Sequence, residues 1–183
     1  MLPPTTKLPK RRTIRLQEYD YSQSGYYFVT ICAKNRRCLF GEIVANAETP
    51  HFTPTLSNIG EIVKECWLNI PIHYPNVLLD QYVIMPNHVH GIIIIDYPRE
   101  KWGQNITSKN RFQHLLSGSL GAVIRGFKIG VTKWCLQNTP YRNIWQRNFY
   151  EHVIRNDQSH AILQEYIANN PCNWHVDELF SDF

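Results

Sequence analysis

The sequence predicts an α+β protein in which helices pack on a four- to five-stranded antiparallel sheet. Two observations support this class. Segments rich in aromatic and β-branched residues alternate with segments whose apolar residues recur at helical spacing. In addition, two apolar strands are joined only by Pro86-Asn87, and a connection this short makes them antiparallel neighbours.

The first half of the chain supplies three strands and one helix. The first strand is expected over 26–33, followed by a short hairpin arm at 38–44 and a proline-containing loop at 46–55. Ser57 can cap a helix that Pro71 ends. Strands over 77–85 and 88–95 come next. The apolar face of the helix is made of Ile59, Ile62, Val63, Cys66, Trp67 and Ile70.

The second half supplies two helices and one strand. A polar connection at 97–113 precedes a helix over 115–136, although four glycines lower its intrinsic helix propensity. The fourth strand is expected over 145–154. Asp157 can then cap a last helix, which Pro171 stops. The order strand–helix–strand–strand–helix–strand is the ferredoxin-like pattern, here followed by a C-terminal helix.

Length and composition indicate one ordinary globular domain. The chain has 183 residues, which is enough for a core without disulfide or metal support, and 43% of them are hydrophobic. The apolar runs are all far shorter than a membrane span. The five cysteines form no Cys-x-x-Cys pair and fit reduced thiols. We therefore expect a cytoplasmic protein with a basic flexible arm at 1–18, a folded domain at 19–175 and a tail at 176–183.

Positive charge is unevenly distributed around a net charge of +4. Between Arg99 and Arg155 there are ten lysines and arginines against two acids, whereas five acids and no basic residue follow Arg155. One basic face that binds phosphates would explain this asymmetry. A solvated surface that happens to be rich in lysine and arginine explains it equally well.

The motif His88-Val89-His90 begins the third expected strand. Side chains alternate along a strand, so the two imidazoles lie on one face and can offer two nitrogens to one metal ion. The competing interpretation is a half-buried polar pair with ordinary hydrogen-bond partners. The rest of the strand is rich in isoleucine, so a polar pair at its start favours the metal site.

Tyr166 and Asn170 lie four residues apart on the last expected helix and therefore share one face. Taken alone, Tyr166 is best interpreted as a core residue beside Ile162 and Ile167. The histidine pair favours a functional role for Tyr166 and Asn170 instead, because a metal ion held by two imidazoles needs a further oxygen ligand and a reactive group beside it.

The chain resembles the single-tyrosine HUH transposases, and in particular the REP-associated tyrosine transposases. The resemblance extends from Tyr19 to Trp174, and four motifs in the same order carry it. These motifs are Tyr26-Tyr27-Phe28-Val29-Thr30, Met85-Pro86-Asn87-His88-Val89-His90, the segment from Trp145 to Arg155, and Tyr166-Ile167-Ala168-Asn169-Asn170-Pro171.

The resemblance implies a ferredoxin-like HUH catalytic domain and an enzyme, a metal-dependent endonuclease and strand transferase for single-stranded DNA. Tyr166 would be the nucleophile that forms a covalent 5′-phosphotyrosine intermediate. His88, His90 and Asn170 would hold a divalent metal, Mg²⁺ or Mn²⁺. The implied partner is single-stranded or hairpin DNA with palindromic repeats, bound by a monomer or homodimer. Relatives often carry histidine two positions after the tyrosine, and this chain has Ala168 there, which could lower activity unless Glu165 or His152 compensates.

Several basic residues are candidates for DNA contacts, and Trp145 and Phe149 are either core aromatics or platforms on which bases stack. The basic candidates are Arg11, Arg12, Arg15, Arg125, Lys128, Lys133, Arg147 and Arg155.

Two other functions compete with a transposase-like enzyme. A domesticated nucleic-acid-binding module would keep the fold without cleavage, but the presence of both histidines, Tyr166 and Asn170 argues against it. A metal-dependent oxygenase or hydrolase of another fold would need a further ligand at strand spacing, and the other histidines show no such arrangement. A replication-initiating nuclease of the same superfamily usually adds a helicase domain, for which this chain has no room.

Overall fold

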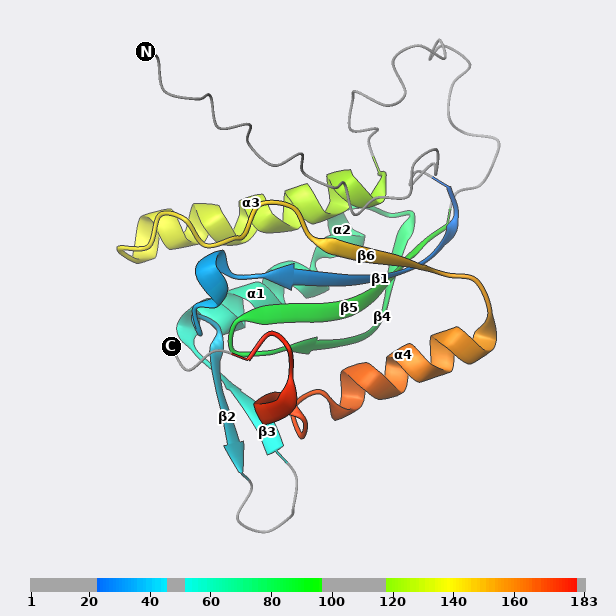
Figure 1. The fold of residues 1–183 in the computed structure, drawn as a ribbon. Coiled ribbons are helices and arrows are strands. Elements are labelled where there is room, and N and C mark those ends of the chain that lie inside the picture. Colours follow the sequence, from blue (N-terminus) through cyan, green and yellow to red (C-terminus); the bar gives the residue numbers. More distant parts are fainter. Residues whose placement is uncertain (1–22, 46–51, 97–117, 181–183) are drawn as a thin grey trace, which may run out of the picture.

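The computed structural model describes residues 23–45, 52–96 and 118–180, and a four-stranded antiparallel sheet lies at its centre (Figure 1). Its strands are β1 (Gly25–Cys32), β4 (Val77–Ile84), β5 (His88–Ile95) and β6 (Tyr150–Ile154), in the order β4-β5-β1-β6. The first and third strands of the predicted pattern are thus central, and the second and fourth lie at the edges. The α+β, ferredoxin-like prediction is confirmed, at the four-stranded end of the expected range.

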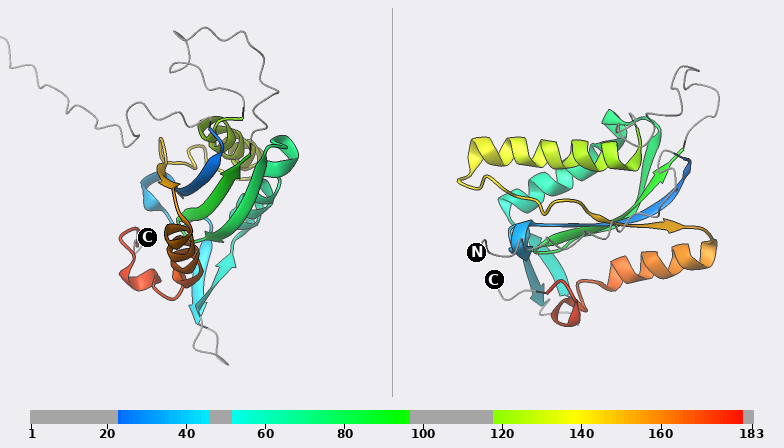
Figure 2. Two further views of the ribbon diagram at one scale, coloured as in Figure 1. Left: turned by 90° about the vertical axis from the view of Figure 1, so that its right-hand side faces the viewer. Right: turned by 45° about the horizontal axis from the view of Figure 1, so that its top comes forward.

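Helices cover both faces of this sheet (Figure 2). On one face lie α1 (Asn58–Leu68), the short α2 (Ile70–His73) and α3 (Leu120–Asn138), and on the other lies α4 (Asp157–Asn169). Strand periodicity divides β1 between them. Tyr27, Val29 and Ile31 join the large core under α1 and α3, whereas Phe28 belongs to a smaller cluster that includes Ile167 of α4. The α4 face carries the residues discussed below.

Local chemistry explains where the helices begin. The hydroxyl of Ser57 accepts a hydrogen bond from the Gly60 amide at 3.1 Å and caps α1, as predicted. The cap of α4 is Asn156 rather than Asp157, because Asn156 has extended backbone angles and its side chain accepts from the Ser159 amide. Pro71 does not end α1. That helix ends at Leu68, and Pro71 lies in the first turn of α2, where its missing N–H is tolerated.

Two strand predictions also need correction. The predicted loop at 46–55 overlaps β3 (Phe52–Leu56), which pairs with β2 (Gly41–Ala45) in a separate two-stranded sheet. Both strands of a two-stranded ribbon are edge strands, and proline, which has no N–H to donate to a neighbouring strand, is tolerated in such strands. The fourth strand begins at Tyr150 rather than 145, because Asn148 has a positive φ of 69° that interrupts extended backbone. The predicted arm at 1–18 and the connection at 97–113 lie outside the described residues.

A polar cluster attaches α4 to the edge strand β4. The Nε2 atom of His160 lies 2.5 Å from an Asp80 carboxylate oxygen, and the Gln164 amide donates to both oxygens of that carboxylate at 3.0 Å. Ile167 is the one fully covered side chain of this helix. The position of α4 on the sheet therefore depends on this cluster as well as on apolar packing.

Within the described residues, none of the helices is long and apolar enough to cross a membrane.

Candidate metal centre and nucleophile

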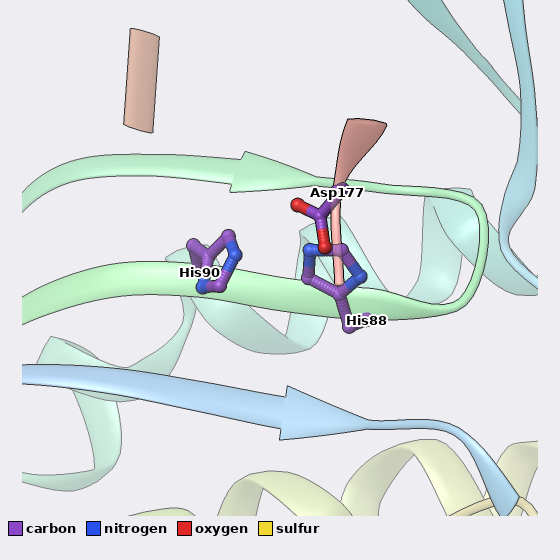
Figure 3. Close-up of side chains that lie close together, drawn as sticks. All are labelled: His88, His90 and Asp177. Atoms are coloured by element: carbon purple, nitrogen blue, oxygen red, sulfur yellow. The ribbon is translucent and has the colours of Figure 1, made fainter. Parts of the chain in front are cut away.

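His88 and His90 lie side by side on the α4 face of β5, as the strand spacing predicts (Figure 3). Their ring centroids are 4.4 Å apart, and the two side chains are almost completely buried, with 0% and 2% of their surface exposed. Pairing with β1 places Cys32 opposite His88 and Thr30 opposite His90. Two imidazoles held this close in a covered position form half of a typical ligand set.

The hydrogen bonds around His88 fix which of its nitrogens faces the site. Asn87 donates through Nδ2 to the backbone carbonyls of Arg36 and Leu179, so its Oδ1 is an acceptor. This Oδ1 lies 2.8 Å from His88 Nδ1, which must therefore carry the proton. The Nε2 atom then presents a lone pair, and it has no hydrogen-bond partner among the described residues. A second group that orients the imidazole in this way is a usual feature of metal-binding histidines.

His90 is oriented by a similar contact on its other side. Its Nδ1 atom lies 2.9 Å from the hydroxyl of Thr30, and its ring stacks on Phe28 at a centroid distance of 5.3 Å. The remaining nitrogen, Nε2, lies 3.3 Å from the hydroxyl of Tyr166. Both histidines thus use Nδ1 for orientation and leave Nε2 for the site.

Oxygen donors complete the cluster. A side-chain oxygen of Asp177 and one nitrogen of each histidine all lie within 4.8 Å of one another, so His88, His90 and Asp177 can hold one metal ion (Figure 3). The buried Asn170 donates through Nδ2 to Asp177 at 2.9 Å. Its Oδ1 has no hydrogen-bond partner within the described part of the chain. His88 Nε2 and Asn170 Oδ1 are thus two covered acceptors without hydrogen-bond partners in the described residues, and this arrangement fits a site built around a cation.

Burial keeps both imidazoles neutral. Desolvation lowers the pKa of His88 to about 3, and the nearby Arg36 guanidinium acts in the same direction, while the Asn170 amide partly opposes it. Desolvation and the neighbouring His88 hold the pKa of His90 well below its ordinary value. Neutral imidazole is the form that binds metals, so the environment prepares both ligands at neutral pH.

Tyr166 lies next to this cluster. It is 44% exposed, and its ring lies 5.2 Å from the His90 ring and 6.0 Å from that of Phe28, so it is not the core residue that its aliphatic neighbours suggest. Burial raises the pKa of its phenol, and the carboxylates of Asp177 and Glu178 add to this. The phenol is therefore protonated at neutral pH and needs local positive charge to act as a nucleophile.

An open cleft of about 1520 Å³ extends from this centre. Tyr166, His90, Asn170 and Asp177 line it together with three basic residues, Lys34, Arg36 and Arg147. The Arg36 guanidinium donates to the carbonyl of Glu178, which holds the C-terminal segment against the cleft. The cleft thus combines a candidate metal centre, an accessible phenol and basic side chains.

The other basic candidates lie away from this cleft or outside the described residues. Arg147 is the one member of the predicted set that lines the cleft within the described part. Arg125, Lys128 and Lys133 lie on α3, on the opposite face of the sheet, and line a smaller groove of about 430 Å³. Arg155 follows β6 and is exposed, and Arg11, Arg12 and Arg15 are not described.

Lys128 is not a free surface cation. Its ammonium donates to the carbonyls of Gln146 and Asn148 at 3.0 and 2.6 Å, and burial lowers its pKa to about 8. Trp145 donates to the Lys128 carbonyl and contacts the rings of Phe40 and Phe127, so it is a core aromatic. Lys128 therefore holds the segment before β6 in place.

Sequence reasoning missed Asp177, Lys34 and Arg36. Residues 176–180 were expected to be part of a tail, but Asp177 accepts from the Leu179 amide and from Asn170 and so faces the histidines. Nothing in the periodicity of this segment signals such a placement. The signal for Lys34 and Arg36 was stronger, because a basic turn directly follows the strand that pairs with His88.

Comparisons with known proteins bear on the family and the fold of the chain. No family model matches the chain. A protein of Haemophilus influenzae, described as an uncharacterized protein, is 45% identical over 177 residues, which is 94% of each chain. Among solved structures, a REP-associated tyrosine transposase bound to a REP hairpin superposes with a TM-score of 0.59 at 21% identity, over 87% of this chain and 73% of that one.

The fold and the predicted resemblance to REP-associated tyrosine transposases are therefore confirmed: the chain has the fold of a single-tyrosine transposase. At the level of sequence, it belongs to the same family as the Haemophilus influenzae protein.

Proposed function

We propose that this protein is a metal-dependent endonuclease and strand transferase for single-stranded DNA, with Tyr166 as the nucleophile. The observation that carries the proposal is the placement of the Tyr166 hydroxyl 3.3 Å from His90 Nε2, at the edge of the cluster of His88, His90 and Asp177. A core tyrosine would not be half exposed beside two buried imidazoles.

A divalent metal fits the residues that surround the proposed centre. His88, His90 and Asp177 would hold it, and the unpaired Oδ1 of Asn170 would supply a further oxygen. A mixed set of imidazole and oxygen donors suits Mn²⁺, and Mg²⁺ is the common alternative with oxygen-rich ligands. When bound, the ion would polarise a phosphate and offset the charge that develops on it. The chain itself keeps the two histidines neutral and correctly oriented.

The proposed reaction is a transesterification. The Tyr166 oxygen forms a bond to phosphorus while the bond from phosphorus to the 3′ oxygen breaks. The phenol proton is lost to solvent, and the 3′ oxygen gains a proton. The 5′ phosphate remains attached to Tyr166, so the energy of the phosphodiester is kept for rejoining to another 3′ hydroxyl. No nucleotide cofactor is needed for such an exchange.

DNA with a hairpin-forming palindrome is the proposed substrate. The solved transposase with the same fold is described as bound to a REP hairpin, and this supports the same class of ligand here. Lys34, Arg36 and Arg147 in the cleft would contact phosphates near the scissile bond. Phosphates farther away would be contacted by the remaining basic candidates, which are Arg125 and Lys133 on α3, Arg155 after β6, and Arg11, Arg12 and Arg15 in the arm. Lys128 would act indirectly, by holding the segment before β6 in place.

Cleavage of labelled hairpin oligonucleotides with single-stranded flanks tests the proposal. With Mn²⁺, the protein should give a shortened strand and a slower-migrating covalent adduct on a denaturing gel. Tyr166→Phe removes only the hydroxyl, so it should bind DNA normally but give neither product. His88→Ala and Asp177→Asn should lose cleavage and weaken Mn²⁺ binding in calorimetry.

Tyr141→Phe is the matched control, because Tyr141 is an exposed tyrosine that contacts Arg37 rather than the metal centre. It should cleave like the unmodified protein. Normal hairpin binding without cleavage in any metal would instead favour a DNA-binding module that has kept the fold alone. Full cleavage by Tyr166→Phe would exclude Tyr166 as the nucleophile.

A further inference from the structure

The cleft has an apolar side that the proposed reaction does not use. Three of its lining residues, Tyr150, Ile162 and Val176, are large apolar side chains with 46%, 58% and 81% of their surface exposed. Ile162 precedes Tyr166 by one helical turn and so shares its face of α4. Exposed apolar side chains gathered in one cleft are a usual mark of a ligand site.

Tyr150 is the member of this group whose position the structure explains best. It is the first residue of β6 and pairs with Thr30 of β1. Its ring and that of Phe28 form a T-shaped contact with centroids 6.4 Å apart, and Phe28 contacts Tyr166 in the same way at 6.0 Å. Phe28 thus contacts both Tyr150 and the candidate nucleophile. A group bound against Tyr150 would lie near the phenol of Tyr166.

The surroundings indicate what kind of group this would be. An exposed aromatic face in a cleft that also holds Lys34, Arg36 and Arg147 offers stacking and phosphate contacts together. Single-stranded nucleic acid has both partners, a flat base and a charged backbone, in each repeat. A paired base inside a duplex could not present its face to Tyr150. The cleft is therefore suited to an unpaired nucleotide.

We infer that Tyr150 is the stacking platform for one unpaired nucleobase next to the phosphate that Tyr166 attacks, with Ile162 lining the same cleft. The inference rests on the proposed function and adds a specific substrate contact to it. Stacking tolerates any base, so this contact holds the strand in register without selecting a sequence. Sequence preference must then come from other contacts.

A scan with abasic nucleotides tests the contact independently of cleavage. In each hairpin oligonucleotide one flanking nucleotide is replaced by an abasic residue, and the affinity is measured by fluorescence anisotropy. The unmodified protein should lose about 5- to 150-fold in affinity at one position, which is the range for one stacked base. Tyr150→Ala should bind the intact DNA more weakly by the same factor and should be insensitive to the abasic residue at that position.

Two substitutions separate stacking from folding. Tyr150→Phe keeps the ring and should retain the sensitivity, whereas Tyr150→Leu keeps apolar bulk without a flat face and should lose it. Tyr141→Ala, which removes an exposed tyrosine outside the cleft-lining residues, should behave like the unmodified protein. Equal abasic sensitivity in the unmodified protein and Tyr150→Leu would overturn the inference even if Tyr166 cleaves. Conversely, position-specific coupling without cleavage would support the stacking site and count against the proposed reaction.

Discussion

Acid should destabilise the metal-free protein through His88 and His90. Their burial lowers the pKa of His88 to about 3 and that of His90 well below its ordinary value, so both stay neutral in the folded state near pH 5.5. In the unfolded chain a histidine has a pKa of about 6.5 and gains a proton there. Because the folded pKa is the lower one, the unfolded state binds more protons, and stability falls as the pH decreases through 6.5.

The size of the effect follows from proton linkage. Between pH 7.5 and 5.5, a histidine that is neutral when folded and titrates at about 6.5 when unfolded lowers the free energy of unfolding by about 1.4 kcal/mol. The two together give about 2.7 kcal/mol. Burial raises the pKa of the Asp80 carboxyl, but its hydrogen bonds with His160 and Gln164 outweigh this effect and lower the pKa below its ordinary value. That group titrates below this window.

Urea denaturation in the presence of EDTA, at pH 7.5 and 5.5, measures how much the free energy of unfolding falls between these two pH values. The double variant His88→Gln/His90→Gln is the comparison, since it keeps polar side chains that do not titrate. The unmodified protein should lose about 2.7 kcal/mol more than this variant over the two pH units. Equal losses in the two proteins would mean that neither buried histidine resists protonation, and the acid sensitivity would then have another source.

Three further predictions concern the rest of the molecule. Gly91→Ala would place a methyl group 2.4 Å from the buried Trp67 ring, and urea denaturation should show a free energy of unfolding lower by about 1–3 kcal/mol. Gly25→Ala is the control: its added methyl group would meet its nearest neighbour at 3.6 Å, so stability should hardly change. Asp80→Asn removes the charge that attaches α4 to β4, and it should lower the free energy of unfolding by about 1–2 kcal/mol. The same substitution should slow cleavage more than it weakens DNA binding. Deleting residues 1–16 should reduce the slope of log affinity against log salt by about 0.7 for each lost contact with single-stranded DNA, and an unchanged slope would remove the arm from the proposed interface.

Strand periodicity explains why most of the fold could be predicted. The nearly continuous apolar runs of β1 and β5 predict strands that are covered on both faces. Because side chains alternate along a strand, the position of His88 and His90 on a common face follows from sequence alone. The same reasoning fails where backbone geometry interrupts the pattern. Asn148, with its positive φ, delays β6 to Tyr150, although the residues before it have strand-like composition.

The candidate site was only partly predictable for a different reason. Tyr166 and Asn170 share a helical face, which is a property of local spacing. Asp177 reaches the histidines because the segment after α4 folds back, and contacts between residues far apart in the chain hold it there, such as the Asn87 amide on the Leu179 carbonyl. Likewise, counting charges cannot reveal that the ammonium group of Lys128, on α3, donates hydrogen bonds to two backbone carbonyls.

The identity of the residue that becomes attached to DNA decides whether Tyr166 is the nucleophile. Cleavage of a hairpin oligonucleotide with Mn²⁺, followed by nuclease and protease digestion and mass spectrometry, locates the covalent link. If Tyr166 is the nucleophile, there will be a single modified peptide with a 5′-phosphate ester on Tyr166 and a free 3′ hydroxyl on the released strand. Attachment to another residue such as Tyr150, or cleavage that leaves no covalent intermediate, would contradict this assignment.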